Sequence, residues 1–158
     1  MSESTRDKRP PSDRRATVAE MNAYNASVPF NVWLGAEVIS ASSEEVTLRI
    51  PWRTEFTAAP GITHGGVLAG AIETAAFMAL MSSYDDAGPT IDMRVDYHRS
   101  TVNGTLHAQA RLLRAGATIA TVEVFIRDSA ERLIASGRCV FLSRSRKKTD
   151  EEPMLQGG

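Results

Sequence analysis

The sequence predicts an α+β fold in which an antiparallel sheet wraps around one long central helix. Runs of alternating apolar and polar residues, typical of strands, stand on both sides of one long apolar segment at residues 65–82. This segment is apolar around nearly its whole circumference, and a helix without a wet face must be covered by other elements. The predicted strands are the only elements available to cover it, so we expect a sheet curled around the helix.

Two strands are expected before the helix and four after it. The first two, residues 31–41 and 44–52, flank a turn at Ser42 and Ser43 and form a hairpin. The later strands are predicted at residues 90–99, 105–114, 117–127 and 132–142. In the first of these, Ile91, Met93, Val95 and Tyr97 alternate with Asp92, Arg94, Asp96 and His98. That strand therefore has one apolar face and one polar face that meets water or a ligand.

The length of 158 residues is that of a single domain. Residues 1–15 and 143–158 are rich in charge, Ser, Pro and Gly and are expected to be disordered tails. The domain is expected to span residues 16–142 and to begin with a short helix at residues 16–27, which ends before Pro29.

Composition excludes several classes of partner. The formal net charge is −1, which does not suggest binding to nucleic acid. No membrane association is expected, because the longest apolar run is interrupted by Glu73 and is shorter than the roughly 20 residues of a membrane span. Cys139 is the only cysteine and is expected to be buried and inert, and no secretory signal is evident, so we expect a cytoplasmic protein.

The start of the long helix has the features of an anion-binding site. The run from Pro60 to Gly66 leads directly into the helix and contains Gly65 and Gly66 at its start. Glycines there allow a ligand to approach the backbone, and the first N–H groups of a helix are unpaired and lie at the positive end of its dipole. A carbonyl oxygen bound there would be polarised, an effect worth roughly 3 to 4 kcal/mol for a well-placed donor.

Glu73 is the only ionisable residue in this helix. A buried carboxylate is costly unless it is paired, protonated or exposed to a ligand. It therefore acts on a substrate as base or nucleophile, or else pairs with an Arg or a backbone amide as a structural group. His64 has the same two interpretations, because it can cap the helix or take part in the chemistry.

Other site chemistries have little support. His98 and His107 fall on separate predicted strands, and the sequence has no close His, Cys and carboxylate pattern of the zinc type, so no metal is expected. Serine-hydrolase and nucleotide-binding motifs are absent from the sequence as well.

The start of the helix carries the motif His64-Gly65-Gly66, and Glu73 follows nine residues after the histidine, directly before Thr74-Ala75. This pattern resembles the signature of the PaaI-like acyl-CoA thioesterases, which are hotdog-fold thioesterases related to the phenylacetate-pathway enzyme. The run from Thr90 to Tyr97 is similar to that family's strand after the helix. The resemblance covers about residues 32–142 and implies the hotdog fold and hydrolysis of an acyl-CoA thioester.

The resemblance also implies roles for individual residues. The Gly65 N–H would polarise the thioester carbonyl, Glu73 of the opposite subunit would be nucleophile or general base, Thr90 would orient water, and His64 would support the site. A homodimer is therefore expected, and a dimer of such dimers is common in the family. Coenzyme A is part of the substrate, and no further cofactor is implied. The expected substrate-binding residues are Gly66, Phe56, Phe77, Tyr84 and Arg94, with Arg53, Arg99 and Arg114 as further candidates for the coenzyme A phosphates.

The chain departs from the family pattern at two positions. The family often has Asn or Gln six residues before the histidine, where this chain has Ala58, and one branch has Thr where this chain has Phe77. Two alternatives stay open: a non-catalytic module that binds acyl-CoA or acts as a regulator, or a hotdog dehydratase or hydratase.

Overall fold

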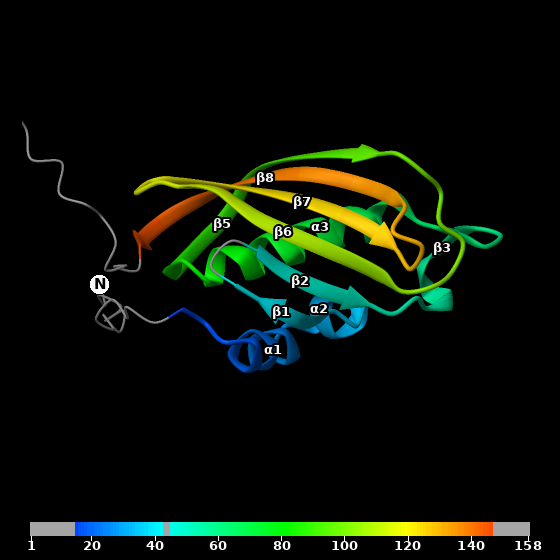
Figure 1. The fold of residues 1–158 in the computed structure, drawn as a ribbon, viewed down its shortest axis with the longest axis horizontal. Coiled ribbons are helices and arrows are strands. Elements are labelled where there is room, and N and C mark those ends of the chain that lie inside the picture. The colour runs from blue at the N-terminus through cyan, green and yellow to red at the C-terminus, as the bar shows by residue number, and fades with distance from the viewer. Residues whose placement is uncertain (1–14, 43–44, 147–158) are drawn as a thin grey trace, which may run out of the picture.

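The computed structural model describes residues 15–42 and 45–146. The elements, in chain order, are α1 (Val18–Ser27), α2 (Pro29–Leu34), β1 (Glu37–Ala41), β2 (Glu45–Ile50), the 3₁₀ turn η1 (Thr54–Phe56), β3 (Thr57–Ala59), β4 (Ile62–Thr63), α3 (Gly65–Met81), β5 (Tyr84–Tyr97), β6 (Leu106–Ala115), β7 (Ile119–Asp128) and β8 (Leu133–Arg146). The predicted α+β class is confirmed, with the long helix inside the curve of the sheet (Figure 1).

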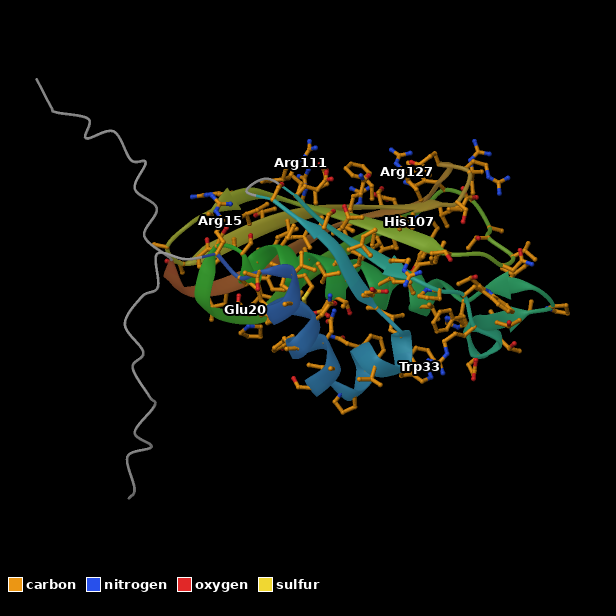
Figure 2. All side chains as sticks on the ribbon, turned by 60° about the horizontal axis from the view of Figure 1, so that its bottom comes forward. Arg15, Glu20, Trp33, His107, Arg111 and Arg127 are labelled. Atoms are coloured by element: carbon orange, nitrogen blue, oxygen red, sulfur yellow. The ribbon has the colours of Figure 1, made fainter. Side chains whose placement is uncertain are left out.

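The main sheet has six antiparallel strands in the order β1-β2-β6-β7-β8-β5. Burial alternates along β7, where Ala120, Val122, Val124 and Ile126 are fully buried toward α3. The other face is polar, and Figure 2 shows Arg111 and Arg127 on the side of the sheet away from α1 and α2. A separate hairpin of β3 and β4 leads into α3.

Helix α3 is covered by the sheet and also by α1 and α2. Its residues Ala71, Ile72, Ala75 and Ala76 are fully buried in the core. One stripe of the helix is less buried, and it comprises Gly66, Gly70, Glu73, Phe77 and Met81. Their spacing of three and four residues places them on one face of the helix.

The N-terminal helices are fixed by their ends and by buried amides. Thr17 and Glu20 form a reciprocal capping box at the start of α1. Asn31 donates to the Asn25 side chain over 2.9 Å and accepts from the Thr74 hydroxyl of α3 over 3.3 Å. This buried amide and hydroxyl chain fixes α1 and α2 against the central helix.

The predicted strand at residues 31–41 is wrong in its first part. Residues 29–34 form α2, which has Pro29 in its first turn, and Gly35 ends it with a φ of 69°. Proline suits the first turn of a helix, and a left-handed glycine suits its end, so these two residues override the strand preference of Val32 and Trp33.

The two edges of the main sheet differ. At the β1 edge, the Asn22 side chain donates to the Val38 carbonyl over 2.9 Å and accepts from the Val38 N–H over 2.8 Å, so α1 closes that edge. At the other edge, no described strand pairs with the outer side of β5. Met93 and Tyr97 of β5 are 38% and 57% exposed, although they lie on the helix side of the sheet. Open edges of this kind favour pairing with another strand.

The ends of the domain differ in part from the prediction. Strand β8 continues to Arg146, so residues 143–146 belong to the sheet and not to a tail. The rest of the predicted tails, residues 1–14 and 147–158, lies outside the described residues. Within the described part of the chain, no helix is long and apolar enough to cross a membrane. The expected cytoplasmic location stays a prediction.

Candidate active site

The hairpin of β3 and β4 delivers the chain to the start of α3. There the His64 side chain accepts a 2.8 Å hydrogen bond from the Gly66 N–H through Nδ1, which confirms the capping interpretation of His64. The Gly66 N–H is thereby occupied. The Gly65 N–H has no hydrogen-bond partner among the described residues, so it is the donor that the helix start offers to a ligand.

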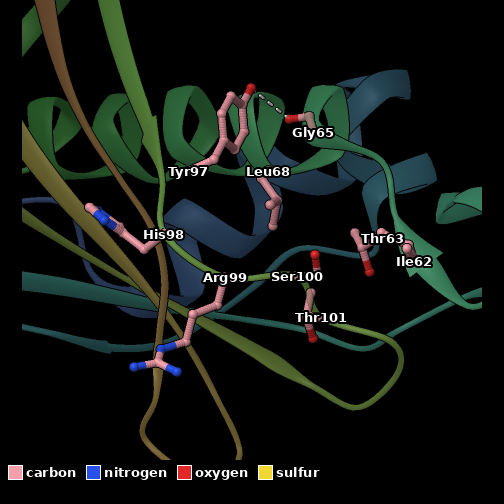
Figure 3. Close-up of a pocket in the computed structure, with 9 residues that line it drawn as sticks. All are labelled: Ile62, Thr63, Gly65, Leu68, Tyr97, His98, Arg99, Ser100 and Thr101. Carbon is pink, nitrogen blue, oxygen red and sulfur yellow. Dashed lines mark hydrogen bonds between the residues drawn. The ribbon is translucent and has the colours of Figure 1, made fainter.

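Tyr97 of β5 packs against this donor. Its hydroxyl donates to the Gly65 carbonyl over 3.1 Å, and its ring lies so close that a methyl group on Gly65 would come within 3.3 Å of ring carbons. Figure 3 shows the tyrosine directly beside the first turn of α3. Glycine at position 65 therefore permits the contact that holds the first peptide of the helix. The sequence did not single out Tyr97, because 32 residues separate the two positions.

Glu73 lies half-buried on the less buried stripe of α3. Its carboxylate accepts a 2.8 Å hydrogen bond from the Thr90 hydroxyl of β5. No Arg or Lys in the described residues forms an ion pair with it. The structure thus places the two predicted residues together, in a setting where one hydroxyl holds the carboxylate without a neutralising cation.

Aromatic rings lie along α3 on both sides of Glu73. One turn before it, the Phe30 ring covers Gly70, and a Cβ on that glycine would lie 2.6 Å from the ring. One turn after it, Tyr24 stacks on Phe77 with ring centroids 5.4 Å apart. Both Phe30 and Tyr24 come from the N-terminal helices, so α1 and α2 form part of the surroundings of the carboxylate.

A pocket of about 320 Å³ opens at the start of α3. Its lining residues are Ile62, Thr63, Gly65, Leu68, Tyr97, His98, Arg99, Ser100 and Thr101. In Figure 3 the Arg99 side chain extends away from α3 on the far side of this pocket from Gly65. Of the four arginines considered from sequence, Arg99 is the one that lines the pocket beside the free N–H.

The remaining predicted binding residues lie elsewhere. Phe56 is fully buried beneath Trp33, and Tyr84 is 3% exposed with its hydroxyl donating to the Gly116 carbonyl. Arg94 lies on the outer face of the sheet and forms a 3.0 Å ion pair with Asp96. These positions are apart from the stripe of Glu73 and from the pocket at Gly65, and their binding roles stay predictions.

Cys139 is a buried residue of β8 and lies opposite Met93 of β5. Burial, and then the negative charges of Glu73 and Asp92, raises the pKa of its thiol to about 12. The thiol is therefore protonated and unreactive at neutral pH. Within the described ranges, no group of three or more His, Cys, Asp or Glu side chains is placed to hold a metal ion.

Comparison with known proteins identifies the family. The family model described as the thioesterase superfamily matches residues 60–145, a segment that contains the helix start, Glu73 and Thr90. The chain belongs to the thioesterase superfamily. The hotdog fold and the resemblance to PaaI-like enzymes are thereby confirmed, and hydrolysis of thioesters is the general chemistry of this superfamily.

Individual members of the thioesterase superfamily match most of the chain. The medium/long-chain acyl-CoA thioesterase YigI of Escherichia coli K12 is 30% identical over 142 residues, covering 79% of this chain and 90% of that protein. A solved protein of the thioesterase superfamily is 35% identical with a TM-score of 0.76, covering 80% of this chain and 98% of that one. The phenylacetic acid degradation protein PaaI of Thermus thermophilus, at 23% identity and a TM-score of 0.67, shares the fold over 73% of this chain and 99% of its own.

Proposed function

We propose that this protein hydrolyses acyl-CoA thioesters to a free acid and coenzyme A, at sites shared between two copies of the chain. The observation that carries the proposal is the Glu73 carboxylate, which is half-buried, held by Thr90 and free of any described cation. It lies on the helix whose first N–H, at Gly65, is available to a carbonyl oxygen. The similarity to an acyl-CoA thioesterase supports this substrate class.

The spacing of the two groups supports a shared site. Gly65 and Glu73 are eight positions apart in one helix, and at a rise of about 1.5 Å per residue their backbones are about 12 Å apart. A donor to a carbonyl oxygen and a base acting at the carbonyl carbon must each lie within about 3.5 Å of their atoms. Glu73 of one copy and Gly65 of a second copy meet this requirement if the helices lie side by side in opposite directions.

The open edge of β5 supplies the dimer contact in this proposal. Pairing of two β5 strands would join the sheets and cover the exposed faces of Met93 and Tyr97. The Asn22 side chain blocks the β1 edge, so β5 is the edge open for pairing. A homodimer results, and a dimer of such dimers stays a prediction.

Hydrolysis follows from these groups in two possible ways. As a general base, Glu73 takes a proton from water while the water oxygen attacks the carbonyl carbon, and the Gly65 N–H of the other copy stabilises the oxyanion. The carbon–sulfur bond then breaks, and the proton passes to the coenzyme A thiolate. As a nucleophile, Glu73 attacks the carbonyl carbon, releases the thiolate and forms a mixed anhydride that water hydrolyses.

The substrate is proposed to lie across both regions of the site. With its carbonyl oxygen at Gly65, the coenzyme A arm would follow the pocket toward Arg99, whose guanidinium suits a phosphate. The acyl group would lie along the less buried stripe of α3 near Glu73, between Phe30 on one side and the Tyr24 and Phe77 stack on the other.

The direct test is release of the coenzyme A thiol from a panel of aryl and alkyl acyl-CoAs by the wild type, Glu73→Ala and Glu73→Gln. We expect both variants to lose about a hundredfold or more in kcat. Turnover that is insensitive to both substitutions would contradict the role of Glu73. A wild type that binds acyl-CoA without turnover would instead identify a binding module. Ala58, an exposed residue of β3, favours this alternative because the family often has Asn or Gln at its position.

A further inference from the structure

Thr63 has a buried hydroxyl without a hydrogen-bond partner. The residue is 5% exposed, and its Oγ1 is fully enclosed and pairs with no group in the described part of the chain. It is the last residue of β4 and directly precedes His64. A buried hydroxyl left unpaired destabilises a fold, since it gives up its bonds to water without replacement.

The backbone contacts of Thr63 do not explain the hydroxyl. The Thr63 N–H donates to the Thr101 carbonyl over 2.9 Å, and Thr63 pairs with Thr57 across the hairpin. Valine has the same shape, favours strands and carries no polar atom, so packing alone would be met better by valine. The hydroxyl therefore needs a partner that the described chain does not supply.

Thr63 lies at the wall of the pocket beside Gly65, with its unpaired hydroxyl enclosed directly behind this wall. Thr63 and Gly65 line the same space, and Arg99 and Ser100 line it from the segment that follows β5. Figure 3 shows Thr63 between the start of α3 and this segment. The unsatisfied hydroxyl and the free helix N–H belong to two residues that line one pocket, and a bound ligand can satisfy both once the Thr63 side chain turns its hydroxyl toward it.

We infer that Thr63 is a substrate-binding residue whose hydroxyl forms a hydrogen bond with an amide of the pantetheine arm of coenzyme A. This inference rests on the proposed function. With the thioester carbonyl at Gly65 and the phosphates at Arg99, the part of the substrate between them is the uncharged arm, whose polar groups nearest the sulfur are amides. A threonine hydroxyl suits either end of an amide, because it donates to a carbonyl and accepts from an N–H.

Thr63→Val and Thr63→Ser test the inference, with Thr57→Val as the matched control. Thr57 is exposed, lies opposite Thr63 in the hairpin and does not line the pocket. Kinetics are measured with one acyl group on coenzyme A and on a simple alkyl thiol that has no amide. We expect Thr63→Val to raise KM for the acyl-CoA about tenfold and to leave kcat/KM for the amide-free thioester unchanged. Thr63→Ser and Thr57→Val should behave as wild type.

Thermal stability gives a second readout, because a binding role and a structural role of Thr63 predict opposite changes in Tm. A substrate-binding hydroxyl that is unpaired in the free protein predicts an unchanged or higher Tm for Thr63→Val. A lower Tm, with equal losses on both thioesters, would overturn the inference and make Thr63 a structural residue. A KM of Thr63→Val for the acyl-CoA equal to that of the wild type would overturn the inference as well.

Binding of coenzyme A itself separates this inference from the proposed function. Calorimetric titration of wild type and Thr63→Val with coenzyme A requires no turnover. Weaker binding by Thr63→Val supports the inference even if the wild type proves catalytically silent, in which case hydrolysis alone is contradicted. Equal binding by the two proteins contradicts the role of Thr63 whatever the wild type turns over.

Discussion

The Thr90 hydroxyl donates a 2.8 Å hydrogen bond to the Glu73 carboxylate, and this contact joins the middle of β5 to the middle of α3. The sequence separation is 17 residues, and the chain between them turns from the helix end into the strand. One carboxylate oxygen is therefore held by the sheet, which leaves the other free of any described partner and available for proton transfer.

Removing this hydrogen bond should slow catalysis without abolishing it. We expect Thr90→Val to lower kcat about tenfold, because a hydrogen bond to a charged group contributes roughly 1.5 to 3 kcal/mol and positions the carboxylate. KM should change little, since Thr90 does not line the pocket beside Gly65. Thr90→Ser keeps the hydroxyl and should retain most of the wild-type kcat. Equal kcat for the wild type and Thr90→Val in steady-state assays would rule this role out.

Gly65→Pro deletes the proposed oxyanion donor with little effect on the helix. Proline suits the first helical position, and His64, with φ −64° and ψ 134°, has the extended conformation that a residue before proline needs. The heavy atoms nearest to a Cβ at position 65 belong to the exposed Tyr97 side chain, which can shift to make room. We expect kcat to fall about a hundredfold or more, with circular dichroism and Tm close to the wild type. An active proline variant would show that another group binds the carbonyl.

Mixing two inactive variants tests the shared site. If Gly65 and Glu73 act across two copies, a dimer of one Gly65→Pro chain and one Glu73→Gln chain contains one intact site and one doubly defective site. Refolding the two variants together at equal amounts should restore about a quarter of wild-type activity, because half of the dimers are mixed and each has one working site. If both groups act within one chain, the mixture stays as inactive as its components.

The fold and the main site residues could be predicted from sequence because they depend on local patterns. The apolar helix with its glycine start and the alternating strands fix the architecture, and the helix start identifies Gly65 and Glu73. Helix α2 was missed because Val32 and Trp33 favour strands, although Pro29 and Gly35 marked its ends. Tyr97, Phe30 and Thr63 were missed for a different reason.

Tyr97 and Phe30 owe their place beside α3 to long-range packing, and the unpaired Thr63 hydroxyl is recognised only from its burial in the folded chain. Tyr97 reaches Gly65 only because β5 runs back along α3, and Phe30 reaches Gly70 only because the buried Asn31 and Thr74 contact fixes α2 on the helix. The alternating pattern of β5 indicated that the strand has one apolar face. It did not indicate that β5 lies at an open edge of the sheet. That property depends on strand order, which the sequence pattern does not specify.

Asp128 should make stability depend on pH in the acid range. The Arg132 side chain donates to this carboxyl, and with the backbone N–H groups of Arg132 and Ala130 it holds the pKa below its usual value against the opposing effect of burial. A carboxyl whose pKa is lowered on folding stabilises the fold above its unfolded pKa of about 3.9, and this contribution is lost as the pH falls toward the folded value. Urea unfolding at pH 7 should therefore give Asp128→Asn a lower free energy of unfolding than the wild type. This difference in free energy should become smaller below about pH 4. A difference in unfolding free energy that does not change with pH would show that the ionised form of Asp128 contributes nothing to stability.

Phe30 should determine which acyl groups fit beside Glu73. Its ring covers Gly70 one turn before the carboxylate, and the buried Asn31 next to it holds it there. Phe30→Ala opens this space, so we expect the ratio of kcat/KM for bulky over small acyl-CoAs to rise about tenfold. Val32→Ala, at an exposed position in the same helix, is the matched control and should keep the wild-type ratio. The comparison uses one acyl series on coenzyme A, and a parallel change for all chain lengths in Phe30→Ala would place the acyl group elsewhere than along α2.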